Sequence, residues 1–252
     1  MTLLGSAPDS KRLADARVLL QTALNYALSL DEQRWLSDRL AQVGMEQSNF
    51  SIDLAFGLCS HHLSTNPFIL NTSQVAKLAE LIPGWELQRT NVDAIARILL
   101  ISCFKDPDKL AIQVERLLRR AESREKLAIY KGFPLYPPSD TLNDCLALGL
   151  NTQMHEVFMS IAHANPYPAL HLDTARFNQM ILKALSMQIS LSPIVGLRER
   201  NNPALVESLL DIARDKHAVY RSVSDELWDL AKQFMSESER REFNLLDAES
   251  CG

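Results

Sequence analysis

The sequence predicts an all-α protein, and three observations support this fold class. Apolar residues recur at helical spacing along nearly the whole chain, and positions i, i+3, i+4 and i+7 lie on one face of a helix. No segment shows the strict alternation of apolar and polar residues that is typical of β-strands. The 252 residues include only 8 glycines, and these form no glycine-rich phosphate loop.

Capping and breaking signals divide the first half of the chain into helices. Asp31 is expected to cap a helix that Gly44 ends. Thr90 to Asp93 is a variant capping box, with Asp in place of Glu or Gln, and Asp106-Pro107 breaks the helix that it opens. The helices predicted in this half are Leu13–Ala27, Asp31–Gly44, Ser51–His62, Ser73–Leu81, Val92–Cys103, Leu110–Leu118 and Glu122–Lys131.

Proline and asparagine mark the connections of the second half. The phrase GFPLYPPSD is a rigid connection, because each proline fixes its own φ and restricts the residue before it. Asn165 tolerates the left-handed conformation past a helix end, so NPYP is predicted as a turn. Asn202 suits an N-cap and Pro203 a first helical position. The helices predicted here are Thr141–Leu148, Thr152–Ala164, Thr174–Ser190, Pro203–Tyr220 and Asp225–Met235.

About ten helices with short connections suggest two architectures. They can stack as antiparallel pairs in an α-solenoid resembling HEAT repeats, or form an irregular bundle, and no sharp repeat period decides between them. We divide the chain into an N-terminal helical part at 1–126, a second helical part at 127–235 and a charged tail at 236–252, which frays or adds a short helix. The two helical parts are expected to form one continuous domain.

Composition argues against several classes of protein. Lys and Arg number 26 against 31 Asp and Glu, and a net charge of −5 does not suit a dedicated nucleic-acid-binding protein. The segment Arg116–Arg120 is therefore interpreted as a solvated helix face.

The four cysteines lack metal-site spacing, so no disulfide framework and no metal site are expected. The most apolar run, Ile95–Phe104, contains Arg97 and is shorter than the ~20 residues that span a bilayer. Without a signal-peptide pattern, we expect a soluble, cytoplasmic protein with no cofactor.

Polar side chains on or beside apolar helix faces are the candidate functional residues. Asn178 lies at the flank of an apolar stripe, and a buried amide must be hydrogen-bonded. It either ties the NPYP turn or a neighbouring helix end, or it contacts a ligand. His217, which we expect to be half-buried, and Lys183 are weak candidates for catalysis. The candidate ligand-binding residues, all of which can equally be structural, are Asn151, Asn165, Tyr167, Asn178 and Asn201.

Phrases in the second half resemble the EboA domain family. LAIYKGFPLYP, LNTQMHEVFMSIAHANPYPA, FNQMILKAL and SPIVGLRERNNPALVESLLDIARDKHAVYRSVSDELWDLA occur in this order, and the resemblance covers about Leu127–Ala231. In the first half only VDAIARILLISC is similar. The chain departs from the family pattern at Phe177, where tryptophan is usual, at GLNT, where an Arg-Thr-Asn phrase is usual, and at Lys216–Ala218, where a Glu-Arg-Trp phrase is usual.

The resemblance implies a role beside other proteins of Ebo-type gene clusters. Such clusters also encode a membrane prenyltransferase-like protein, a TatD-like hydrolase and sugar-phosphate-isomerase-like proteins, and are linked to making or exporting secondary metabolites. We expect an accessory protein that binds a small lipophilic or polar intermediate or a partner protein. The alternative is an enzyme that acts on a secondary-metabolite or isoprenoid-type precursor through an Asn/His/Lys-lined pocket.

Overall fold

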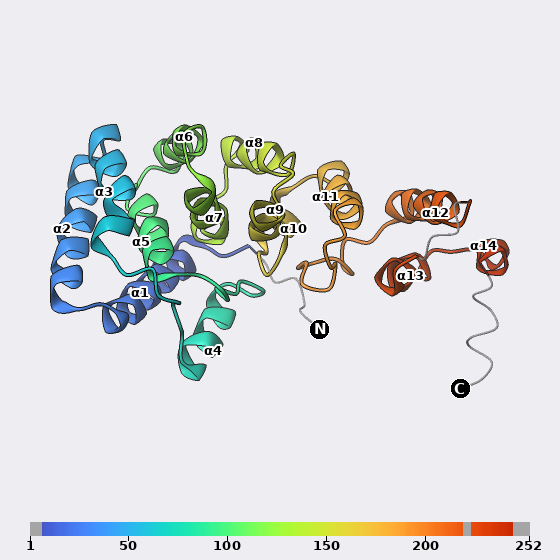
Figure 1. Ribbon diagram of the computed structural model, residues 1–252, viewed down its shortest axis with the longest axis horizontal. Helices are drawn as coiled ribbons and strands as arrows, with labels where there is room; N and C mark the ends of the chain where they lie inside the picture. The colour runs from blue at the N-terminus through green and yellow to red at the C-terminus, as the bar shows by residue number, and fades with distance from the viewer. Residues whose placement is uncertain (1–6, 219–222, 244–252) are drawn as a thin grey trace. The chain divides into compact units, whose positions relative to one another are not determined.

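A computed structural model describes residues 7–218 and 223–243, and the regular secondary structure within them is helical (Figure 1). The prediction of an all-α fold is confirmed. Fourteen α-helices lie in the described residues, so the estimate of about ten is low. Each of the twelve predicted segments corresponds to one of them. The two additional helices are short, and they occupy the predicted turn at Tyr167–His171 and the predicted tail at Glu237–Glu242.

Most of the helices follow one another with short connections, and longer ones at 82–91 and 187–202 precede α5 and α12. The first seven are α1 Ser10–Ala27, α2 Leu30–Glu46, α3 Asn49–His62, α4 Thr72–Leu81, α5 Val92–Ile101, α6 Pro107–Leu118 and α7 Ser123–Lys131. A 3-10 helix, η1, spans Phe133–Leu135. The others are α8 Asp140–Gly149, α9 His155–Ala162, α10 Tyr167–His171, α11 Thr174–Ser186, α12 Pro203–Ala218, α13 Asp225–Ala231 and α14 Glu237–Glu242.

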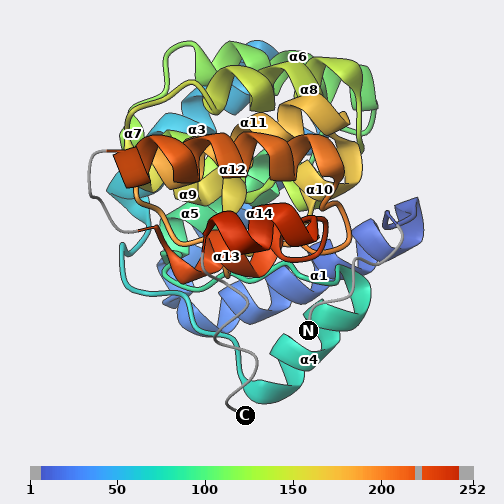
Figure 2. The ribbon, with the colours of Figure 1, turned by 90° about the vertical axis from the view of Figure 1, so that its right-hand side faces the viewer.

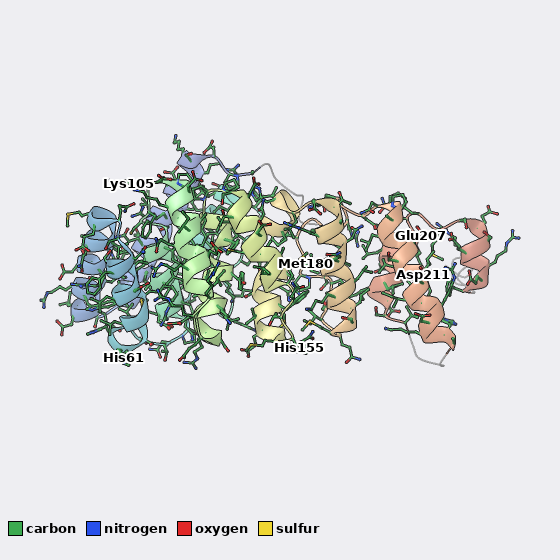
Figure 3. All side chains as sticks on the ribbon, turned by 90° about the horizontal axis from the view of Figure 1, so that it is seen from above. His61, Lys105, His155, Met180, Glu207 and Asp211 are labelled. Carbon is green, nitrogen blue, oxygen red and sulfur yellow. The ribbon has the colours of Figure 1, made fainter. Side chains whose placement is uncertain are left out.

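The chain divides into two compact units. Unit 1 contains residues up to 173 together with 193–195, and unit 2 contains residues 174–192 and those from 196 onward. In unit 1, helices α5, α7 and α9 pack in succession in one layer, and α3, α6 and α8 form a second layer against them (Figure 1). Helix α1 packs on α4 and α5. In unit 2, α12 packs on α13 (Figure 2), and Glu207 and Asp211 lie on the exposed face of α12 (Figure 3).

The ends of α2 differ from the prediction. The N-cap is Ser29, not Asp31, because Ser29 and Glu32 form a complete capping box, in which Glu32 accepts the Ser29 N–H at 2.8 Å. The helix also continues past Gly44. It ends at Gln47, which adopts φ +48° and whose side-chain amide donates to the carbonyls of Val43, Gly44 and Cys103. The side chain of Gln47 thus satisfies helix-end carbonyls and holds a conformation that glycine usually provides.

Helix α5 begins without the predicted capping box. Asn91 is the N-cap and makes no side-chain capping bond, and Asp93 does not reach back along the chain. Asp93 instead accepts a 2.5 Å hydrogen bond from Arg97, and both side chains are less than a tenth exposed. The Arg97 guanidinium also lies 5.3 Å from the centre of the Phe56 ring. A buried arginine needs a charged partner, so Asp93 is used inside the core and not at the helix end.

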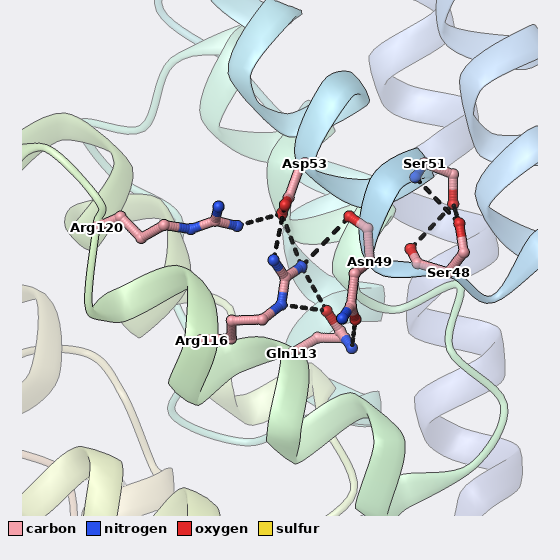
Figure 4. Close-up of polar contacts among 7 residues, drawn as sticks. All are labelled: Ser48, Asn49, Ser51, Asp53, Gln113, Arg116 and Arg120. Atoms are coloured by element: carbon pink, nitrogen blue, oxygen red, sulfur yellow. Dashed lines mark hydrogen bonds and ion pairs between the residues drawn. The ribbon is translucent and has the colours of Figure 1, made fainter.

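Arg116 of α6 and Arg120, just after the end of α6, are joined to α3 in a polar cluster (Figure 4). Arg116 donates twice to the carboxylate of Asp53, at 2.7 Å each, and Arg120 donates once at 2.5 Å. Burial alone would raise the pKa of Asp53, but the hydrogen bonds and positive charges of the two arginines lower it overall. Arg116 also donates to Gln113. The two arginines that contact Asp53 therefore form an interhelical clamp, where the sequence had predicted only a solvated face.

Candidate functional site

Four segments of unit 1 that are distant in sequence meet at a small pocket. Its lining includes three prolines from two connections, the start of α10, part of α1 and the residues just before α1. The pocket is partly open to solvent, and its cavity volume is only about 10 Å³. We call this site the tyrosine–proline pocket, after Pro134, Tyr136, Pro138, Pro166, Tyr167 and the adjacent His171.

A close approach at Gly132 positions Tyr136, the first of the two tyrosines. Gly132 ends α7, and a Cβ at this position would collide with the hydroxyl of Tyr136. The glycine therefore lets the hydroxyl end of the Tyr136 ring approach the end of α7, and Tyr136 is only 1% exposed. The Tyr136 hydroxyl has no hydrogen-bond partner among the described residues. Pro134, one residue into η1, fixes the turn between them.

Tyr167, the second tyrosine, is held by aromatic contacts and by an amide. Its ring meets Phe133 edge to face at 5.1 Å and lies 4.4 Å from the ring of His171. Its backbone N–H donates to Oδ1 of Asn165 at 3.0 Å. The Asn165 amide group donates in turn to the carbonyls of Tyr130 and Ser160, at 3.2 and 3.3 Å. Asn165 therefore joins α7, α9 and α10 and sets the start of the helix that carries Tyr167.

The conformation of the NPYP phrase differs from the prediction. The left-handed residue is Ala164, with φ +48°, and Asn165 is 2% exposed. Pro166 then precedes a short helix, α10, and not a simple turn. The physical reason is that the Asn165 side chain is drawn into the core by main-chain partners, so the residue before it takes up the reversal of the chain.

The titratable groups of the pocket are uncharged near neutral pH. Burial raises the pKa of Tyr136 well above its ordinary value. Burial also raises the pKa of Tyr167, although the backbone at Ser139 offsets part of the effect. Burial lowers the pKa of His171, so the neutral imidazole is favoured. The pocket thus presents aromatic, proline and aliphatic surface with neutral polar groups, which suits an uncharged apolar ligand.

The remaining candidates of unit 1 and unit 2 have separate roles. Asn151 is exposed in a turn after α8 and does not line the pocket. In unit 2, Asn178 and Asn202 exchange two hydrogen bonds, of 3.2 and 2.9 Å, and Asn202 caps α12 by accepting the N–H of Leu205 at 3.0 Å. The N-cap prediction for Asn202 is confirmed. The partner of Asn178 is a neighbouring helix end, one of the two structural alternatives.

The described part of unit 2 shows no contact that joins Asn201, Lys183 and His217 in one site. The Asn201 amide donates to the carbonyl of Leu230 at 2.9 Å and so connects to α13. Lys183 is half-buried on α11. His217 is exposed, and the prediction that it is half-buried is wrong, because the buried stripe of α12 ends one turn earlier, at Ala213. The Phe243 ring lies beside the imidazole, with ring centres 5.5 Å apart. Functional roles for these residues stay predictions.

Sequence reasoning missed most of the pocket. Tyr136, His171 and the three prolines were not among the candidates, although Tyr167 was. The available signal was the presence of two phrases rich in proline and tyrosine, GFPLYPP and NPYP, each interpreted separately as a connection. Their proximity depends on how α7 and α9 pack, and a single sequence does not specify this packing.

Within residues 7–218 and 223–243, no group of three or more His, Cys, Asp or Glu side chains is placed to hold a metal ion. No helix in these ranges is long and apolar enough to cross a membrane.

Comparison with known proteins gives one match. The sequence model of a family described as "Metabolite traffic protein EboA" matches residues 16–232, which is most of the chain. No curated protein and no solved structure shows significant similarity. The match includes both segments that contribute tyrosines to the pocket.

Proposed function

Because the chain belongs to the EboA family of metabolite traffic proteins, we propose that it is a cytoplasmic accessory protein that binds a small apolar intermediate in the tyrosine–proline pocket. The intermediate belongs to a secondary-metabolite biosynthesis or export system. In this role the protein holds the compound and passes it on without changing it.

The observation that supports this proposal most strongly is the convergence at the pocket. GFPLYP and NPYPA, two of the phrases that carry the family resemblance, supply Pro134, Tyr136, Pro166 and Tyr167 to one site. Their rings offer apolar and aromatic surface, and the polar groups among them are neutral. Binding sites for small molecules are generally concave and largely apolar, with a few placed polar groups.

The enzyme alternative receives less support from the same residues. A proton-transfer step needs a group with a pKa near the working pH and a second polar group that positions the substrate. Asn165 already uses its donors and its acceptor on main-chain groups, and the raised pKa of Tyr167 keeps its hydroxyl protonated. We therefore place the candidate polar residues of this region in a structural role around a binding pocket.

Traffic also requires delivery to another protein. We extend the proposal to transient contact with other Ebo-cluster proteins, among them the membrane prenyltransferase-like protein. Such contact would let a compound that is poorly soluble in water leave the pocket without entering bulk solvent, since exposure of its apolar surface is unfavourable.

The test fills the pocket with a larger side chain. Leu170 lines the pocket and is half-buried, whereas Leu148 is 70% exposed on α8 and serves as the matched control. We expect Leu170→Trp to weaken binding of N-phenyl-1-naphthylamine, an uncharged apolar fluorophore, by about ten-fold or more, while Leu148→Trp leaves it unchanged. Equal affinities for the two variants would contradict the proposal.

A second measurement separates binding from catalysis. Native mass spectrometry of the protein purified from its own host should show a co-purifying small molecule that Leu170→Trp loses. Prolonged incubation of that molecule with the protein should return it unchanged. Steady conversion to a product would instead support the enzyme alternative.

A further inference from the structure

The pocket is too small, as it stands, to hold the ligand that its walls suit. Its interior space of about 10 Å³ corresponds to about one water molecule, whereas a cavity that accepts a single benzene ring measures about 150 Å³. Some part of the lining must therefore move before an apolar compound can enter. Which part moves depends on how firmly each wall is held.

Most of the walls are firmly held. Tyr136 and Tyr167 are 1% and 2% exposed, and the start of α10 is fixed by Asn165. Leu13 lies within α1, and Ile82 is a buried helix-end residue whose N–H is bonded to the carbonyl of Leu78. Moving any of these walls would break helical hydrogen bonds or expose core side chains, and both changes are costly.

Pro138 is exposed, but the chain is held on both sides of it, by the buried Tyr136 and by Ser139, which caps α8. The residues just before α1 are the least firmly held wall. Ala7 is exposed and Pro8 is half-buried, and both line the pocket. In the described part of the chain, neither residue makes a hydrogen bond with its backbone or side chain. Pro8 has no N–H to satisfy. These two residues therefore line the pocket through contact alone, and their departure would break no hydrogen bond between described residues.

A defined anchor follows this segment. Asp9 is the N-cap of α1, and its side chain accepts the N–H of Arg12 at 2.8 Å. The Asp9 carbonyl also accepts the N–H of Leu13. Rotation about the backbone between Pro8 and Asp9 can therefore move the preceding segment while α1 keeps its first turn and its cap.

We propose that Ala7–Pro8 is a displaceable strap that gates the tyrosine–proline pocket. The proposal rests on the proposed function and adds its regulation and its ligand class. Pro8 lines the pocket together with Tyr136 and Tyr167, so an apolar ring of an uncharged ligand that displaces Pro8 would pack against the tyrosine wall. When a ligand enters, the protein loses only the contacts that Ala7 and Pro8 make with the pocket. When the ligand leaves, the strap returns and closes the pocket.

The experiment weakens the strap without touching the other walls. Pro8→Gly removes the ring and loosens the backbone, and Pro8→Ser is a second, less flexible variant. The matched control is Pro107→Gly, at an exposed proline that starts α6 and does not line the pocket. Binding is measured with N-phenyl-1-naphthylamine. The environment of the pocket is followed by fluorine NMR of protein labelled with 3-fluorotyrosine, in which Tyr136→Phe and Tyr167→Phe assign the signals.

Gating predicts a joint change in the two measurements. Both Pro8 variants should bind the fluorophore about three- to ten-fold more tightly than the unaltered chain, since the binding-competent state becomes more populated. Their ligand-free Tyr136 and Tyr167 signals should move toward the positions seen in the ligand-bound unaltered chain. Pro107→Gly should change neither affinity nor signals.

Two results would overturn the strap, and each is distinct from failure of the proposed function. If Leu170→Trp abolishes binding while both Pro8 variants keep the original affinity and tyrosine signals, the pocket binds ligand but the strap does not gate it. If the Pro8 variants bind more weakly, the segment is part of the permanent binding surface. Failure of the function itself would show as unchanged binding in Leu170→Trp.

Discussion

Three Asn-Pro pairs occur in the chain, and two of them, Asn165-Pro166 in unit 1 and Asn202-Pro203 in unit 2, are used differently by the structure. Asn165-Pro166 in unit 1 is buried, and the amide joins three main-chain groups beneath the tyrosine–proline pocket. Asn202-Pro203 in unit 2 caps α12 and exchanges hydrogen bonds with Asn178. The same dipeptide thus fixes a core junction in one place and a helix start in the other. The difference lies in the surroundings, since one amide meets buried carbonyls and the other meets a second amide near the surface.

The largest effect is expected at Asn165. Asn165→Ala leaves the carbonyls of Tyr130 and Ser160 and the N–H of Tyr167 without the partners that they now have in the core. We expect the free energy of unfolding to fall by about 3 kcal/mol, measured by urea denaturation followed by circular dichroism. A loss below about 1 kcal/mol would show that water replaces the amide and that the junction is not held as described.

The next effect tests the close approach beside the pocket. Gly132→Ala places a Cβ against the hydroxyl of Tyr136, and the ring is too buried to move freely. Overpacking of this kind costs about 2 kcal/mol. Gly44→Ala is the control, because a Cβ there meets no atom within 4 Å. Equal stability of the two variants would mean that the Tyr136 ring has room that the structure does not show.

The corresponding change in unit 2 should be smaller. Asn178→Ala removes a half-buried partner of Asn202, but Asn202 still caps α12 and donates to the carbonyl of Arg200. We expect a loss of about 1 kcal/mol for Asn178→Ala. A double-mutant cycle with Asn202→Ala should give a coupling energy of about 0.5–1 kcal/mol. A coupling energy near zero would show that the hydrogen bonds between Asn178 and Asn202 do not stabilise unit 2.

The smallest expected effect is a dependence of the protein's stability on pH that arises from His171 in the tyrosine–proline pocket. Burial lowers the pKa of His171 below the value of about 6.5 in the unfolded chain, so the unfolded state binds more protons in that range. The contribution of His171 is therefore present above about pH 6.5 and is lost as the pH falls. Thermal unfolding of unit 1 between pH 7.5 and 5.5 should show this loss in the unaltered chain and less of it in His171→Gln. His61→Gln, at an exposed histidine, should follow the unaltered chain.

The sequence predicted the helices better than it predicted the site. Helical periodicity located every long helix, because the apolar faces of α1, α11 and α12 repeat at helical spacing and are buried as expected. Local capping signals were less reliable. Asp31 and Asp93 are both good capping residues, but Ser29 already forms a capping box with Glu32, and Asp93 is needed by the buried Arg97. Such competition between nearby polar groups depends on the tertiary structure.

The pocket shows the same limit more clearly. Tyr167 and Asn165 were among the candidates, whereas Tyr136, although it also lies beside prolines, and His171 were not. Only the packing of α7, α9 and the segment before α1 brings them to one place. The unit 2 amides, in contrast, contact groups that the sequence already suggested, since Asn202 was expected to be an N-cap and Asn178 to tie a helix end.

The most direct test of the binding site is photolabelling with an uncharged apolar diazirine probe, followed by peptide mapping by mass spectrometry. We expect the labels to concentrate on residues 134–138 and 166–171, and we expect Leu170→Trp to remove them from both segments. Labels spread evenly over the helices, or concentrated on residues 203–218 of unit 2, would contradict it.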